Sequence, residues 1–116
     1  MSVSMERSTI SLHEACYQGR LDVVARLLAE GANPNEPADA TEREWVSCAG
    51  GRPRPLNCVA IAWDMTEYHL QIARLLIQYG GIVDDSVIRD HAVEMCGGPN
   101  DRVFREILEA ARRVSR

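Results

Sequence analysis

The side chains best suited to chemistry are the three histidines and four cysteines, and their spacing decides what they could do. His91 with Cys96 is the pair that loosely suggests two metal ligands or a nucleophile with its base. Side chains three or four positions apart share a helix face, and these two are five apart. No nucleophile, base and orienting residue form a recognisable set. We therefore expect no catalytic residues and predict that the protein is not an enzyme.

The cysteines also lack the spacing of a metal site. Cys16, Cys48, Cys58 and Cys96 form neither CxxC pairs nor a zinc-finger pattern. No glycine-rich phosphate loop follows a predicted strand. We expect no metal, no cofactor and reduced thiols, with Cys16 and Cys58 acting as small apolar residues. A cryptic metal-dependent or hydrolytic protein that uses His91, Cys96 and nearby acidic residues is the most distant alternative.

Charge and hydropathy argue against two further classes of partner. The net charge is −4, which disfavours electrostatic binding to nucleic acid. The chain has no run of about 18 apolar residues that could span a membrane, and residues 1–9 lack the apolar core of a signal peptide. We therefore expect a cytoplasmic protein without nucleic-acid or membrane partners. All 13 basic residues are arginine, which suggests the codon usage of a GC-rich bacterial genome.

Residues 11–35 carry the clearest structural pattern. Apolar residues recur every three or four positions in two runs, which predicts two short helices: Leu12, Ala15 and Cys16 in the first, and Leu21, Val24, Leu27 and Leu28 in the second. Gly19 separates the helices, and Gly31 follows the second, where a left-handed residue is favoured. Ser11 and Glu14 predict a capping box at the start. Such a hairpin cannot bury both faces alone, so it needs a similar neighbour.

The same stretch resembles one ankyrin repeat. Leu12-His13 with Ala15-Cys16, the Leu27-Leu28 pair and the turn over residues 31–35 are similar to that family's Pro-Leu-His-x-Ala-Ala opening, Leu-Leu pair and Gly-Ala-Asp-x-Asn turn. The chain departs from the pattern at Ile10-Ser11, where the family has Thr-Pro, and at Cys16, where it has Ala. The resemblance implies stacked helix pairs that bind another protein. It also implies that His13 braces the turn through a buried hydrogen bond.

Two weaker copies follow the first. Residues 55–60 resemble the opening motif with Pro55 at the first helical position, and Thr66 can cap the helix that ends at Gly80-Gly81. A shift of 32 residues aligns this helix with the last one, in which Pro99 again stands at the first position. The apolar side of the helix between them is predicted to be Ile88, His91, Ala92 and Met95.

We therefore predict one all-α domain over residues 1–116, a short ankyrin-like α-solenoid of three helix-turn-helix pairs. Repeat 1 covers about 9–35, a long loop covers 36–54, and repeat 2 covers about 55–84. A degenerate repeat 3, which acts as a C-terminal cap, covers about 85–116.

The resemblance also implies where a partner would bind, because ankyrin partners contact the concave side and the tips of the loops. Carried over to this chain, the candidate contact residues lie on first helices, in the long loop and in the inserted turn: Tyr17, Gln18, Ile61 and Ala62, then Trp45, Arg52 and Arg54, and finally Trp63. The corresponding third-repeat positions are Val93 and Glu94. Tryptophan, tyrosine and arginine are enriched at binding hot spots. An alternative remains open in which Trp45 folds back over the first hairpin and Trp63 covers the inserted turn.

The predicted function is a non-enzymatic protein–protein interaction module that captures a partner as an inhibitor, a toxin-neutralising subunit or a tethering subunit. We expect a monomer, with a homodimer as the alternative. A structural scaffold that self-associates through an exposed apolar side is the alternative function.

Overall fold

The structure is a computed structural model that describes residues 11–37, 53–62, 65–94 and 98–114. Over these residues it consists of six helices and contains no strand. The helices are α2 (Leu12–Gln18), α3 (Leu21–Ala29), α4 (Pro55–Ala60), α5 (Glu67–Gln78), α6 (Asp85–Glu94) and α7 (Pro99–Val114). The predicted all-α fold of helix-turn-helix pairs is confirmed, and Pro55 and Pro99 begin their helices as expected.

The helices begin where the sequence places capping side chains. The Oγ of Ser11 accepts a hydrogen bond from the backbone N–H of Glu14 at the start of α2. Thr66 does the same for the N–H of His69 at the start of α5. Both bonds satisfy backbone donors that have no partner inside the helix.

Glycines follow α3 and α5, each of which is the second helix of its pair. Gly31 and Gly80 have φ of 104° and 102° and follow α3 and α5. The backbone N–H of Ala32 donates to the carbonyl of Leu27, and that of Gly81 donates to the carbonyl of Leu76. These bonds close the left-handed helix ends that the glycine positions predict.

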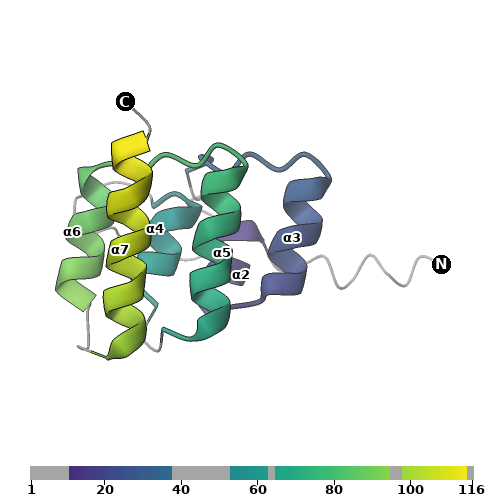
Figure 1. Ribbon diagram of the computed structural model, residues 1–116. Coiled ribbons are helices and arrows are strands. Elements are labelled where there is room, and N and C mark those ends of the chain that lie inside the picture. Colours follow the sequence, from purple (N-terminus) through teal and green to yellow (C-terminus); the bar gives the residue numbers. More distant parts are fainter. Residues whose placement is uncertain (1–10, 38–52, 63–64, 95–97, 115–116) are drawn as a thin grey trace.

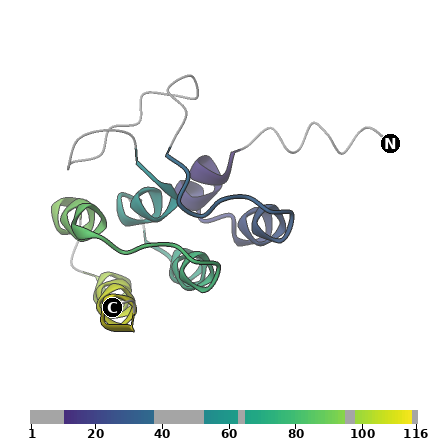
Figure 2. The same ribbon diagram turned by 90° about the horizontal axis from the view of Figure 1, so that it is seen from above.

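The helices form two rows, one made of α2, α4 and α6 and the other of α3, α5 and α7 (Figures 1 and 2). Within each row every helix packs against the next, and the two helices of each pair also contact each other. The turns stack as well, since the side chain of Asn35 donates to the carbonyl of Gly80 (3.0 Å) and accepts from the backbone N–H of Ile82 (2.9 Å). Helix pairs stacked in this way make a solenoid.

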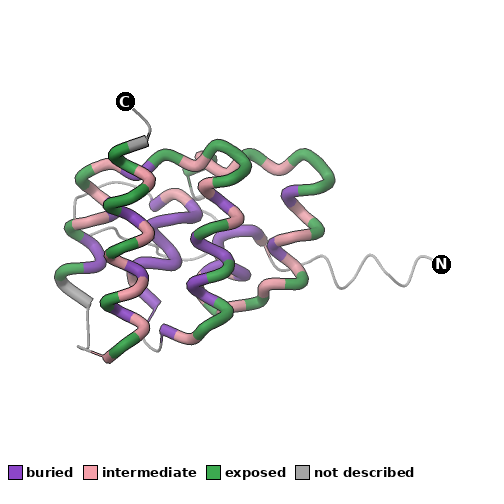
Figure 3. Tube along the Cα trace, in the orientation of Figure 1, coloured by how far each residue is buried: buried purple, intermediate pink, exposed green. Residues whose placement is uncertain are grey.

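The core lies between the two rows, and equivalent residues of the three pairs build it (Figure 3). Two sets of buried side chains in the second-helix row stand at matching positions of the three pairs: Val24, Ile72 and Phe104, and Leu28, Leu76 and Leu108. The predicted alignment between the second and third units is therefore confirmed. Cys16 and Cys58 are fully buried in the first-helix row and fill the space of small apolar residues, as expected.

The apolar side predicted for α6 needs a correction. His91 is buried, but Ala92 is exposed, Ile88 is only half-buried, and Met95 lies outside the described residues. Val87 and Asp90 are buried in their place. The prediction failed because it counted apolar residues only, whereas this helix turns an ionisable side chain inwards toward a polar partner on α4.

Candidate partner-binding surface

Two buried histidines brace the first-helix row through hydrogen bonds to backbone carbonyls. The Nε2 of His13, on α2, lies 2.6 Å from the carbonyl oxygen of Glu36, in the segment that follows repeat 1. The His13 side chain is buried and the bond is partly buried, so water competes with it less than at the open surface. The bracing role that the resemblance implies for His13 is therefore confirmed.

His69 forms a second brace, this time between two repeats. The backbone N–H of Thr66 donates to its Nδ1 (3.0 Å), so Nδ1 is the acceptor and Nε2 carries the proton. Nε2 then donates to the carbonyl oxygen of Tyr17 (2.9 Å). Gly19 lies against the ring, because a Cβ added there would stand 2.7 Å from the Cε1 of His69. The last turn of α2 is thus fixed against the first turn of α5.

A buried polar network joins α4 and α6, the first helices of the second and third pairs. The Oδ1 of Asn57 accepts from the backbone N–H of Arg54, and its Nδ2 donates to Asp90 (2.8 Å) and to Ser86 (3.1 Å). Asp90 is wholly buried and Asn57 is nearly so. Buried polar groups that pair across elements fix one arrangement, because any slip would leave them without partners in a low dielectric.

Arg54 contributes its guanidinium to an ion pair with Asp84, in the turn before α6. Burial raises the pKa of the Asp84 carboxyl, but the hydrogen bond from Ser86, the charge of Arg54 and the N–H of Val87 together hold it below its ordinary value. The carboxylate accepts from the N–H and Oγ of Ser86 at 3.0 and 2.6 Å. Arg54 therefore ties the end of the long loop to the third helix pair.

The predicted contact residues have different surroundings in the structure. Tyr17 and Ile61 are half-buried and Gln18 is exposed, so these three present surface on the first-helix row. Arg54 is half-buried and paired with Asp84. Trp45, Arg52 and Trp63 lie outside the described residues, as do the side chains of Val93 and Glu94.

Ala62 does not fit the contact role predicted for it, because it is only 5% exposed. Helix α4 is six residues long and ends at Ala60, so Ala62 lies in the turn after the helix and not on its outer face. Its backbone N–H donates to the carbonyl of Val59. All six residues of α4 are buried as well. Among the described residues of this row, the accessible surface lies mainly at the end of α2, at Ile61 after α4 and along the outer side of α6.

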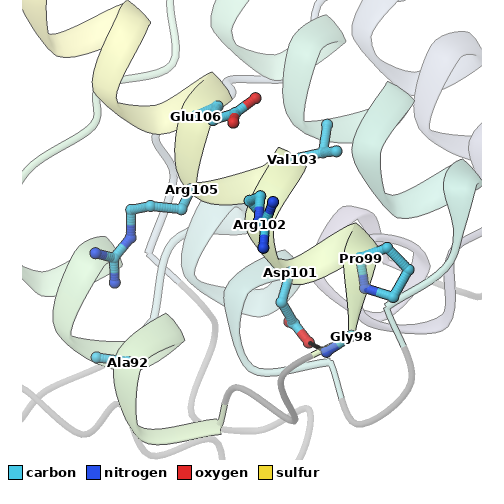
Figure 4. A pocket seen from close by; sticks show the side chains of 8 residues that line it. All are labelled: Ala92, Gly98, Pro99, Asp101, Arg102, Val103, Arg105 and Glu106. Atoms are coloured by element: carbon cyan, nitrogen blue, oxygen red, sulfur yellow. Dashed lines mark hydrogen bonds between the residues drawn. The ribbon is translucent and has the colours of Figure 1, made fainter.

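A cavity of about 880 Å³ lies at the start of α7 and reaches α6 (Figure 4). Asp101 accepts a hydrogen bond from the backbone N–H of Gly98, while Arg105 extends from α7 towards α6, where Ala92 lies. The Nε of Arg105 has no hydrogen-bond partner among the described residues.

His91 lies next to this cavity and forms the only carboxylate–imidazole pair among the described residues. Its Nε2 is 3.1 Å from the Oδ1 of Asp101, and its ring meets that of Phe104 edge to face. Burial lowers the pKa of His91, and the charge of Arg105 lowers it further, against the opposing effect of Asp101. His91 has no exposed surface, so it cannot reach a substrate.

The thiols of the described residues are buried away from solvent. Cys16 is fully buried, and burial beside Cys58 raises the pKa of its thiol, which disfavours the reactive thiolate. No group of three or more His, Cys, Asp or Glu side chains in this part of the chain could hold a metal ion. No helix among the described residues is long and apolar enough to cross a membrane.

Comparison with known proteins gives one result for the chain. Residues 11–39 match the model of the ankyrin repeat family, which covers α2, α3 and the turn that His13 braces. No curated protein and no solved structure matches the chain. The first helix pair is therefore similar to an ankyrin repeat, and the helix pairs of the described residues form a short ankyrin-like α-solenoid. Repeats of this kind are generally non-enzymatic modules for binding other proteins.

Proposed function

We propose that this ankyrin-like chain is one domain of three repeats that binds a partner protein through the first-helix row. The contact centre is the end of α2, with Tyr17 and Gln18, and the neighbouring turn with Ile61. The contact roles predicted for Trp45, Arg52 and Trp63, which lie outside the described residues, stay predictions. Capture of the partner requires no chemical step, so the chain acts as an inhibitor, a toxin-neutralising subunit or a tethering subunit.

The observation that carries the proposal is the anchoring of Tyr17. Its backbone carbonyl is held by the Nε2 of His69, and its side chain is half-buried beside the exposed Gln18. An aromatic side chain on a fixed backbone loses little conformational entropy when a partner covers it. Tyrosine is also among the residues that dominate binding energy when they become fully desolvated. The end of α2 is therefore suited to act as a preformed anchor.

Two of the predicted residues take a different role in this proposal. Arg54 is held by Asp84, so it positions the end of the loop and does not serve as a free cation for the partner. Ala62 is part of the core. The remaining described contact residues, Tyr17, Gln18 and Ile61, come from the first and second repeats.

The test is affinity capture from the source organism with matched variants of the full chain, followed by quantitative mass spectrometry. Tyr17→Ala removes the proposed anchor, and Gln18→Trp adds bulk at an exposed position beside it. Tyr68→Ala is the control, because Tyr68 is 59% exposed on α5, in the other row.

We expect at least one protein to be retained by the wild-type chain and by Tyr68→Ala, and to be depleted at least about tenfold with both Tyr17→Ala and Gln18→Trp. Circular dichroism must show that all variants are folded. If Gln18→Trp and Tyr17→Ala retain the same proteins as the wild-type chain, the end of α2 is not the binding surface.

A further inference from the structure

The groove between α5 and α7 is an open apolar surface on the second-helix row. Its volume is about 860 Å³. Partly buried apolar side chains from both helices form its floor: Ile77, Val103, Ile107 and Ala111. Ile82 is 53% exposed at the end where Gly80 and Gly81 leave the groove open. Exposed apolar surface of this kind, bordered by polar residues, is typical of an interaction site.

Two charges of opposite sign flank this groove. Arg74 on α5 and Glu106 on α7 are both exposed and both line it. They occupy equivalent positions of adjacent repeats, 32 residues apart, as do the buried Ile72 and Phe104. Helices α5 and α7 lie side by side (Figure 1). From their equivalent positions in adjacent repeats, Arg74 and Glu106 stand at the same level on the two walls. Within the described part of the chain, neither side chain forms an ion pair.

We propose that this groove is the interface of a homodimer, in which a second copy of the chain packs its own α5–α7 face against it. The two-fold axis lies parallel to the helices, between α5 and α7. It places α5 of each copy over α7 of the other at the same level, so that Arg74 of each faces the partner's Glu106. One symmetric contact thus forms the same ion pair twice.

The charges select this arrangement over its alternatives. A two-fold axis perpendicular to the helices would place each Arg74 near the partner's Arg74, and like charges in contact are repulsive. A strongly acidic or strongly basic partner helix would meet one repulsive wall, because the groove carries one charge of each sign. Exposed Ala110 has a small side chain and allows a facing helix to approach the groove closely.

The dimer is compatible with partner binding but does not depend on it. The α3–α5–α7 row lies opposite the α2–α4–α6 row (Figure 2), and Figure 4 shows Val103 and Glu106 on the same side of α7. A contact through α5 and α7 therefore leaves the first-helix rows of both copies facing outwards. Such a dimer would carry two binding surfaces, and two linked surfaces bind a multivalent partner more tightly than one.

Sedimentation equilibrium of the purified full chain, over about 1 to 200 µM, tests the proposal by charge exchange. We expect a reversible equilibrium between the 12.9 kDa monomer and a species of twice that mass. Arg74→Glu and Glu106→Arg should each weaken dimerisation at least about tenfold, and the double variant Arg74→Glu/Glu106→Arg should restore it. The matched control is Arg26→Glu, since Arg26 is the equivalent position of the first repeat and lies outside the groove.

All of these residues are exposed, so thermal melts should show folded variants throughout. Three outcomes would overturn the proposal. The first is a monomer over the whole range, and the second is a dimer that Arg26→Glu weakens as much as Arg74→Glu does. The third is a double variant that dissociates as readily as the single ones. None of these outcomes concerns the end of α2, so the proposed partner binding at that site is tested independently of the dimer.

Discussion

Replacing Gly19 by alanine should destabilise the fold through two effects that can be measured separately. Gly19 has a φ of 78°, and a side chain in the left-handed region costs roughly 1–2 kcal/mol. The new Cβ would also stand 2.7 Å from the Cε1 of His69, which must then move. That movement weakens the hydrogen bonds of His69 to Thr66 and to Tyr17. At about 0.5–1.5 kcal/mol each, the two bonds add about 1–3 kcal/mol.

The total expected for Gly19→Ala is therefore about 2–5 kcal/mol of unfolding free energy. In a His69→Ala background the ring is absent, so the same change should cost only about 1–2 kcal/mol. The difference between the two backgrounds is the coupling energy of a double-mutant cycle. Urea unfolding followed by circular dichroism measures all four free energies.

Gly31→Ala is the matched control. Gly31 also has a positive φ, 104°, but a Cβ added there would meet nothing within 4 Å. Its cost should be the same with and without His69. Equal costs of Gly19→Ala in the two backgrounds would refute the contact between Gly19 and His69, and with it the fixed position of Tyr17.

Three further predictions follow from the core and its buried charges. Leu76→Ala removes a wholly buried side chain from the middle repeat and should cost about 2–5 kcal/mol in urea unfolding, whereas a loss below about 1 kcal/mol would place Leu76 outside the core. Deletion of residues 85–116 removes α6 and α7 and exposes the side of α5 that carries Ile72, so the shortened chain should show no cooperative melt near the temperature of the intact protein. The pKa of His91 is lowered in the folded protein, so the unfolded chain binds a proton at this histidine more readily than the folded protein does. The contribution of His91 to the free energy of unfolding is therefore fully present above an ordinary histidine pKa of about 6.5, and it is lost as the pH falls from there. His91→Gln should flatten this decline between about pH 7.5 and 5.5. The lowered pKa of Asp84 affects stability only below about pH 4, so the two effects can be separated. If the free energy of unfolding of His91→Gln depends on pH as steeply as that of the wild-type chain, the lowered pKa of His91 is contradicted.

The parts of the fold that depend on local rules could be predicted from the sequence. Ser11, Thr66 and the glycines after α3 and α5 mark helix ends because they act within a few residues of themselves. The buried positions of α3, α5 and α7 follow from the helical period, since apolar residues occupy nearly all of them. Repetition of these local patterns, together with the resemblance to ankyrin repeats, predicts three stacked helix pairs.

The parts that depend on distant partners could not be predicted in this way. Asp90 is buried because Asn57, 33 residues earlier, donates to its carboxylate, and no periodicity of apolar residues reports such a pair. Ala62 was placed on a helix face by alignment with the first repeat, but α4 ends two residues before it. The second bond of His69, to the carbonyl of Tyr17, spans 52 residues and becomes visible only in the folded chain.

The central claim is that the end of α2 presents a preformed anchor to a partner protein. Calorimetric titration of the captured partner with Tyr17→Ala and with Tyr68→Ala tests it most directly, since both changes remove a tyrosine but from opposite rows. We expect Tyr17→Ala to weaken binding by about 2 kcal/mol or more, as at a hot spot. Tyr68→Ala should change it by less than about 0.5 kcal/mol. Equal affinities for the wild-type chain and Tyr17→Ala, or a larger loss with Tyr68→Ala, would contradict the account.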